Sequence, residues 1–198
     1  MARRRARSCP LASVRAVRVV LASASPRRRA LLEGVGLDVQ VVPADVDETP
    51  VPGESPREMV ARLARAKAAA VGSRAGAVVV AADTTVDLDG VSLGKPADAA
   101  EAEAMLRSLA GRAHLVHTGV AVIGTSGSSH VVVTTEVVFA PIDDATVAWY
   151  VGTEEPYDKA GGYAVQGLAA RFVEAVSGSL TNVIGLPVEE TMALVRAH

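Results

Sequence analysis

A turn near the N-terminus combines hydroxyl and guanidinium groups in the way that a phosphate-binding site requires. An apolar run ending at Leu21 gives way to small residues, then to Ser25 and Pro26, which predicts a strand, a tight turn and a helix start. Ser25 is the expected N-cap and Pro26 the first helical residue. Arginines fill positions 27–29, although a helix N-terminus favours acidic residues. Free amides, hydroxyls and guanidinium groups together favour a bound polyphosphate; the alternative is that the arginines point into solvent.

A carboxylate follows the most apolar run of the chain. Residues 77–82 form a short continuous apolar segment, typical of a central strand buried on both faces, and Asp83 comes directly after it. A buried carboxylate is costly unless it is paired or binds a ligand, and open α/β sheets place their sites at the carboxyl ends of strands. Asp83 is therefore the leading catalytic candidate. The alternative is an aspartate that caps a turn.

Two loops could supply further ligands. Residues 45–48 hold three carboxylates, Glu48 among them, just past an expected strand over 37–42. They could hold a divalent cation or form a solvated turn. Asp89-Gly90 predicts a tight hairpin turn, which delivers Lys95 between a glycine and a proline. This lysine could contact phosphate oxygens or point into solvent.

The elements that must position these residues alternate between strands and helices. The helix that follows Ser55 is well marked, because a proline comes next and Glu58 stands three residues after the serine. Its expected buried stripe is Met59, Val60, Leu63, Ala66 and Ala70, with Lys67 near the edge, where it could reach an anion. Strands are predicted over 17–21, 37–42, 77–82, 85–88, 91–93, 114–123, 130–139 and 171–176. Helices are predicted from 25 to 34 or 36, over 55–71 and 98–109, from 143 or 144 to 150, and over 187–196.

Histidine and glycine patterns add little chemistry. His114 and His117 lie three apart on an expected strand and so point to opposite faces, which argues against one metal bound by both. Residues 156–167 are rich in glycine and could let the backbone approach a ligand closely, although a glycine-rich loop alone is a weak signal.

The composition is that of an ordinary globular protein. Of 198 residues, 49% are hydrophobic and 21% charged, which predicts one domain over 16–198 after a disordered tail over 1–15. A net charge of −2 gives no reason to expect a nucleic-acid partner. No apolar segment reaches the roughly 18 residues of a membrane span, so no membrane partner is expected. The single cysteine, Cys9, excludes an intrachain disulfide and suits a reducing cytoplasm.

Four motifs stand in a characteristic order. Residues 21–28 read Leu-Ala-Ser-Ala-Ser-Pro-Arg-Arg, 81–84 read Ala-Ala-Asp-Thr, 94–96 read Gly-Lys-Pro, and 158–167 read Asp-Lys-Ala-Gly-Gly-Tyr-Ala-Val-Gln-Gly. Together they resemble the Maf family of nucleoside triphosphate pyrophosphatases, and the resemblance covers essentially residues 17–195. It implies an α/β fold, with a mixed twisted sheet, flanking helices and two lobes around a deep cleft, similar to inosine triphosphate pyrophosphatases.

The resemblance also implies a reaction and a set of roles. The family hydrolyses a nucleoside triphosphate between its α and β phosphates, releasing a monophosphate and pyrophosphate, with Mg or Mn as cofactor; a homodimer is implied as well. Asp83 matches the catalytic acid, as the base that activates water or as a metal ligand, and Glu48 matches an acidic residue near the metal. The residues expected to bind substrate are Ser23, Ser25, Arg27, Arg28, Lys67, Thr84, Lys95 and Gln166.

Two positions bear on the substrate. Thr84 and Gln166 resemble the branch of the family that prefers dTTP and UTP, and both side chains could hydrogen-bond a pyrimidine edge. The same chemistry on 7-methyl-GTP or other nucleotides is an alternative. A further hypothesis is a nucleotide-binding regulator of septum formation. Asp83 argues against a pure binder, because a carboxylate facing a polyphosphate costs affinity unless a metal bridges the two.

Overall fold

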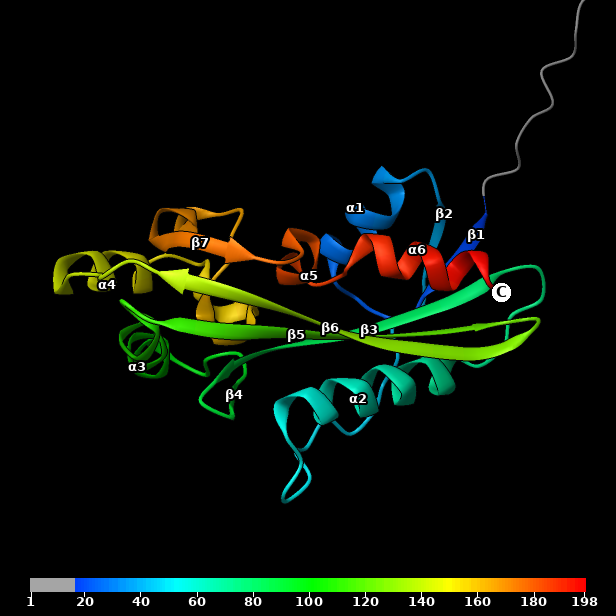
Figure 1. Cartoon of the computed structure of the whole chain (residues 1–198), viewed down its shortest axis with the longest axis horizontal. Coiled ribbons are helices and arrows are strands. Elements are labelled where there is room, and N and C mark those ends of the chain that lie inside the picture. The colour runs from blue at the N-terminus through cyan, green and yellow to red at the C-terminus, as the bar shows by residue number, and fades with distance from the viewer. Residues whose placement is uncertain (1–16) are drawn as a thin grey trace, which may run out of the picture.

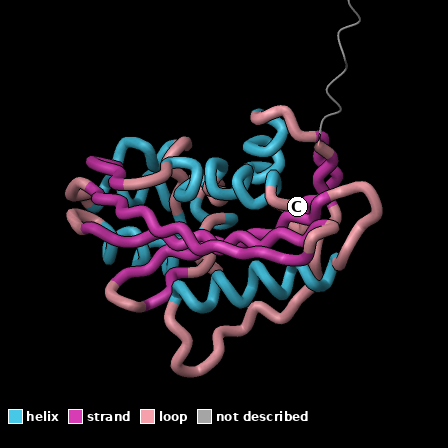
Figure 2. The backbone as a smooth tube through the Cα atoms, turned by 45° about the vertical axis from the view of Figure 1, so that its right-hand side comes forward, coloured by secondary structure: helices cyan, strands magenta, loops and turns pink. Residues whose placement is uncertain are grey.

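The computed structural model of the chain describes residues 17–198, so the predicted tail over 1–15 and Cys9 lie outside the described residues (Figures 1 and 2). A seven-stranded mixed sheet has the order β2-β1-β3-β5-β6-β7, with β4 paired to β3. The strands are β1 (Arg18–Leu21), β2 (Asp38–Val41), β3 (Val78–Leu88), β4 (Val91–Leu93), β5 (Ala113–Gly124), β6 (Gly127–Phe139) and β7 (Val173–Ser177). The helices are α1 (Pro26–Gly34), α2 (Pro56–Val71), α3 (Ala99–Leu109), α4 (Asp144–Val151), α5 (Leu180–Ile184) and α6 (Val188–Arg196), with short 3₁₀ turns over 156–172.

Helices cover both faces of the sheet, which confirms the predicted α/β class. Figure 1 shows α2 along one face and α1, α5 and α6 on the other. On the second face, alternate residues of β3 and β5 belong to two separate hydrophobic clusters: Ala82 and Val120 to one, Val86 and Val116 to the other. The register pairs two threonines, Thr84 and Thr118, between these clusters. This polar pair separates the two hydrophobic clusters on that face, while a third cluster lies on the α2 face of the sheet; the two lobes that the resemblance implies stay a prediction.

The two helix starts form as predicted. Ser25 caps α1, and its hydroxyl accepts a hydrogen bond from the backbone N–H of Arg28 at 3.4 Å. At α2, the Ser55 hydroxyl accepts from the Glu58 N–H at 3.3 Å, and the Glu58 carboxylate accepts from the Ser55 N–H at 2.9 Å. Each cap satisfies backbone donors that a helix leaves unpaired, which fixes where each helix begins.

The predicted buried stripe of α2 is partly wrong. Val60 and Leu63 are buried, but Met59 and Ala66 are only half-buried and Ala70 is exposed. The helix is turned so that its remaining buried positions are Pro56, Ala64, Lys67, Ala68 and Val71. The helix packs so closely on β5 that a Cβ added to Gly119 would lie 2.3 Å from the backbone oxygen of Val60.

Strand β3 is longer than predicted. It does not end before Asp83 but continues to Leu88 and turns at Asp89 and Gly90, both with positive φ, into the predicted hairpin with β4. Its neighbours are short: β1 pairs with Val78–Val80, and β4 pairs with Val86–Leu88. Residues 81–85 therefore form an open notch in that edge of the sheet.

Further differences from the prediction concern one loop, one strand boundary and one helix. The loop between β5 and β6 is shorter than the predicted 124–129, because the strands pair as far as Gly124 and Gly127. Arg171 lies in a 3₁₀ turn before β7 rather than in the strand, and α5 was not predicted. Within residues 17–198, no helix is long and apolar enough to cross a membrane.

Candidate active site

The notch in the edge of β3 opens into a cleft of about 690 Å³. Side chains alternate across a strand, so Asp83 faces the side of α2 and Thr84 faces the side of α1 and α5. The cleft reaches both sides. Its wall includes all ten residues that the sequence singled out, namely Ser23, Ser25, Arg27, Arg28, Glu48, Lys67, Asp83, Thr84, Lys95 and Gln166.

On the α2 side, Lys67 joins the two carboxylates that were predicted to act together. Its Nζ lies 2.6 Å from Asp83 Oδ1 and 2.7 Å from Glu48 Oε1. The Lys67 and Asp83 side chains are only 10% and 11% exposed, whereas that of Glu48 is 60% exposed. Lys67 is thus not at the helix edge, as predicted, but buried, because its ammonium compensates the charge of a buried carboxylate.

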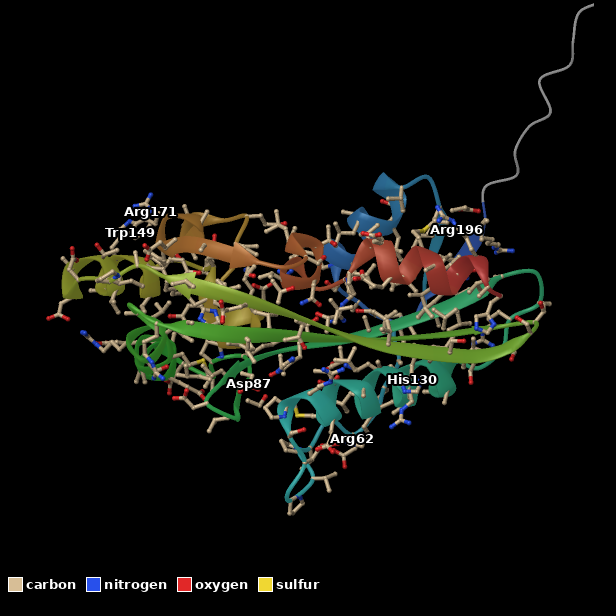
Figure 3. The ribbon with its side chains drawn as sticks, viewed as in Figure 1. Arg62, Asp87, His130, Trp149, Arg171 and Arg196 are labelled. Atoms are coloured by element: carbon tan, nitrogen blue, oxygen red, sulfur yellow. The ribbon has the colours of Figure 1, made fainter. Side chains whose placement is uncertain are left out.

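The acidic loop is held against α2 by a second cation. Arg62, on α2, donates from Nε to the Glu54 carboxylate at 2.7 Å and from Nη2 to the backbone oxygen of Thr49 at 3.2 Å (Figure 3). These bonds fix the chain directly after Glu48. The other acidic residues of the loop, Asp45 and Asp47, do not line the cleft.

Arg28 connects three segments on the α1 and α5 side of the notch. Its guanidinium donates to the backbone oxygen of Gly185 at 2.8 Å, to Ser23 Oγ at 3.1 Å and to Thr84 Oγ1 at 3.0 Å. Burial lowers the pKa of Arg28, while the negative charge of Asp83 opposes that shift. An arginine guanidinium stays protonated in proteins even when burial lowers its pKa, so Arg28 places a fixed positive charge on the wall of the cleft.

Arg27 also lines the cleft, but it pairs with another residue of the cleft wall, Asp158. Its Nη1 lies 2.9 Å from Asp158 Oδ2, and Lys159 pairs with the same aspartate. The segment that carries Asp158 is fastened to the loop of Lys95, since the Gly161 N–H donates to the Gly94 oxygen at 2.9 Å.

The glycines of residues 156–167 have structural uses. A Cβ on Gly161 would lie 2.8 Å from a methyl group of Val86, and one on Gly167 would lie 2.3 Å from the Glu155 carboxylate. That carboxylate accepts from the backbone N–H groups of Leu168 and Ala169 at 2.7 and 3.0 Å. At both glycines, the backbone thus lies close to another part of the protein, where we expected it to lie close to a ligand.

Lys95 and Gln166 line the cleft from two different loops, and both are exposed. Ser25 also lines it, but its hydroxyl caps α1. Three residues near this site were not predicted: Asp158, Thr118 and Gly185. Thr118 lies opposite Thr84, and the two hydroxyl oxygens are 2.9 Å apart. The pairing of the two strands could have predicted the contact between Thr84 and Thr118. No feature of the local sequence indicates that the backbone oxygen of Gly185 lies near the site.

The carboxylates suit a divalent cation. No group of three or more histidine, cysteine or acidic side chains that could hold a metal ion occurs in the described part of the chain. Glu48 and Asp83 nevertheless converge on one ammonium group, so both can reach one positive charge. Mg²⁺ is commonly held by one or two carboxylates together with substrate phosphates, and this donor set fits that pattern.

The sequence is similar to those of known proteins. A family model described as "Maf-like protein" matches residues 18–198. The dTTP/UTP pyrophosphatase of Anaeromyxobacter dehalogenans strain 2CP-C is 55% identical over 185 residues, which are 91% of this chain and 94% of the relative. The dTTP/UTP pyrophosphatase of Myxococcus xanthus strain DK1622 is 52% identical over 89% of this chain and 90% of the relative. The solved structure of the Staphylococcus aureus Ham1 protein is 17% identical, with a TM-score of 0.44 over 78% and 90% of the two chains, a likeness too distant to bear on function.

Proposed function

The chain belongs to the Maf family, and we propose that it is a nucleoside triphosphate pyrophosphatase acting on dTTP and UTP. It would cleave the bond between the α and β phosphates and release a nucleoside monophosphate and pyrophosphate. One observation carries the proposal: the buried carboxylate of Asp83 faces the same cleft as Arg28, beside the lysine that pairs with it. Curated relatives about half identical to the chain bear the name of this activity.

The proposed mechanism relies on positioning and charge. Phosphoryl transfer needs little covalent help from a protein, so the cationic groups of the cleft bind and orient the triphosphate. Arg28, Lys67 and Lys95 line the cleft from three different elements and can contact different phosphate oxygens. Asp83 orients the attacking water and accepts its proton, which leaves the carboxylate protonated until the product departs.

A bound Mg²⁺ or Mn²⁺ would be held by Glu48 and Asp83, and it would neutralise charge that develops on the phosphate oxygens. Lys67, between these carboxylates, keeps them close together. On the other side of the notch, Thr84 and Gln166 supply the polar groups that we expect to contact the base. We also expect a homodimer that acts in the cytoplasm, with no nucleic-acid or membrane partner.

The test measures pyrophosphate release from dTTP, UTP, CTP, GTP and 7-methyl-GTP, with Mg²⁺ or Mn²⁺, for wild type and Asp83→Asn. We expect release from dTTP and UTP, and a loss of about 10²- to 10⁴-fold in the variant, the usual contribution of a general base. The matched control is Asp87→Asn, on the same face of β3 (Figure 3). Asp87 pairs with His117 at 3.0 Å, is 13% exposed and does not line the cleft, so its variant should keep activity within about twofold.

The outcomes separate the hypotheses. Release of orthophosphate in place of pyrophosphate would contradict the cleavage site. Release confined to 7-methyl-GTP would move the substrate to the alternative class. Tight nucleotide binding by both proteins with no turnover of any substrate would favour a regulatory binding protein over an enzyme.

A further inference from the structure

We infer that Thr118, a buried residue outside the cleft wall, fixes the direction of the Thr84 hydroxyl proton and thereby makes Thr84 a hydrogen-bond acceptor toward the nucleobase. The inference rests on the proposed function, since it concerns how that cleft reads its substrate. Thr118 is fully buried, and it lies opposite Thr84 in the register of β3 and β5.

The Thr84 hydroxyl has one proton and two lone pairs to distribute. Arg28 Nη2 lies 3.0 Å from Thr84 Oγ1, and a guanidinium can only donate, so this contact occupies one lone pair. The other close polar neighbours of Thr84 Oγ1 are Thr118 Oγ1 at 2.9 Å and the Gly185 oxygen at 3.4 Å.

The atom that accepts the hydroxyl proton of Thr118 determines whether Thr84 donates to Thr118 or accepts from it. Thr118 Oγ1 lies 3.0 Å from the backbone oxygen of Asn182, which can only accept, so Thr118 donates there. Thr118 then has no second proton for Thr84, and Thr84 must donate to Thr118. If Thr118 instead donated to Thr84, the Thr84 proton would go to Gly185 O, at a longer distance and to an oxygen that already accepts from Arg28 Nε at 2.8 Å.

Either arrangement keeps the Thr84 proton inside the protein. The shorter contacts favour the first, which leaves one lone pair of Thr84 free for the substrate. Uracil and thymine carry a proton on N3, whereas N3 of cytosine is an acceptor. Thr84 can therefore accept from the ring N–H of uracil or thymine, but cytosine would set two acceptors against each other, and an unsatisfied polar contact is costly.

The partner that takes the Thr118 proton is rigidly held. Asn182 is fully buried, and its side-chain Nδ2 donates to the Val116 oxygen and to Thr135 Oγ1, both at 3.0 Å. Its backbone oxygen is thus fixed relative to β5, which keeps the proton arrangement from reversing when substrate enters.

The experiment measures binding rather than turnover. Isothermal titration calorimetry compares the α,β-methylene analogues of UTP and CTP on wild type, Thr118→Val and Thr118→Ser. Wild type should favour the uracil analogue. In Thr118→Val the remaining protein acceptor near the Thr84 hydroxyl is the Gly185 oxygen, at 3.4 Å and already accepting from Arg28 Nε. N3 of cytosine can compete with this weaker acceptor for the Thr84 proton, so the variant should strengthen the cytosine analogue and reduce the affinity ratio by roughly tenfold, the value of one hydrogen bond. Thr118→Ser keeps the hydroxyl and should keep the ratio.

Two further variants make the result specific. Thr118→Ala also lacks the hydroxyl and is smaller than threonine, so the same loss of discrimination is expected from it. Thr191→Val is the matched control, because Thr191 is fully buried and its hydroxyl donates to a backbone oxygen, that of Pro187, at 2.7 Å. Thr191 does not line the cleft, and its variant should keep the wild-type ratio.

Several results would overturn the inference. An unchanged ratio in folded Thr118→Val and Thr118→Ala, or an equal loss of affinity for both analogues, would reduce Thr118 to a structural role. Equal binding of the two analogues by wild type would refute the inference whatever the hydrolysis assay shows. Conversely, the wild type could bind the UTP analogue more tightly than the CTP analogue and yet release no pyrophosphate from UTP. That result would refute the proposed reaction but not the proposed role of Thr118 in base recognition.

Discussion

Replacing Lys67 by methionine should destabilise the fold strongly, because it strands a buried charge. The ammonium is 2.6 Å from Asp83 Oδ1, and the two side chains are 10% and 11% exposed. Removing one partner of such a buried pair typically costs about 3–5 kcal/mol, whereas a pair with an exposed partner contributes about 0–1 kcal/mol. Glu48 is 60% exposed, so nearly all of the loss should come from Asp83. We expect about 3–4 kcal/mol, a large part of the total stability of an ordinary domain.

A double-mutant cycle isolates that contribution. Asp83→Asn leaves Lys67 paired with Glu48, so it should cost less, about 1–2 kcal/mol. The double variant Lys67→Met/Asp83→Asn has no stranded carboxylate, and its cost should fall about 2 kcal/mol below the sum of the single variants. The measurement is urea unfolding followed by far-UV circular dichroism at pH 7 in the presence of a chelator.

The control is a pair of the same charge type on the surface. Arg29 and Glu33 lie 2.7 Å apart on α1, with side chains 55% and 43% exposed, so Arg29→Met should change stability by less than about 0.5 kcal/mol. Strict additivity of the Lys67 and Asp83 changes, or a loss below about 1 kcal/mol in Lys67→Met, would show that the buried pair does not carry the charge compensation argued here.

Two other predictions concern packing and pH. Gly119→Ala places a Cβ 2.3 Å from the Val60 oxygen, so α2 must move and the free energy of unfolding should fall by about 1–3 kcal/mol. The control is Gly34→Ala, which has open space around it and should change the free energy of unfolding little. Equal urea midpoints for the two variants would contradict this prediction. Burial lowers the pKa of His114 to about 4, below the 6.5 of an unfolded histidine. The unfolded state thus takes up the proton first, and stability should fall by about 3 kcal/mol as pH drops from 6.5 through 4. His114→Gln should flatten that part of the pH profile, and an identical profile in wild type and variant would refute the assignment.

Local signals predicted the helix starts because a cap is a short-range interaction. At the starts of α1 and α2, the serine hydroxyl accepts from a backbone N–H three residues later, and the proline after the serine has no N–H to satisfy, so the local sequence contains both partners of each cap. The position of the notch is different. Asp83 was expected at the end of a strand, yet β3 continues to Leu88. The opening arises because β1 ends beside Val80 and β4, which runs antiparallel to β3, ends beside Val86, a property of neighbouring strands that no local pattern in β3 predicts.

The stripe of α2 shows a signal that was present but misinterpreted. Val60, Ala64, Lys67 and Val71 follow helical spacing as well as the predicted set does. If the buried set of α2 is chosen by hydrophobicity alone, the set that contains Lys67 is rejected. Its burial makes sense only with Asp83 opposite, and that pairing depends on the docking of α2 against β3. A charged residue at a core position was therefore the available indication of a site.

The three arginines at the start of α1 show why residue type predicted the chemistry better than the individual roles. Successive residues of a helix point about 100° apart, so a cluster in sequence is dispersed in space. Arg28 points inward to Thr84 and Gly185, Arg27 reaches Asp158, and Arg29 pairs with Glu33 along its own helix. The first two directions depend on partners more than fifty residues away. The sequence predicts an anion site at this turn, and that site stays a prediction, whereas the partner of each arginine required the tertiary structure.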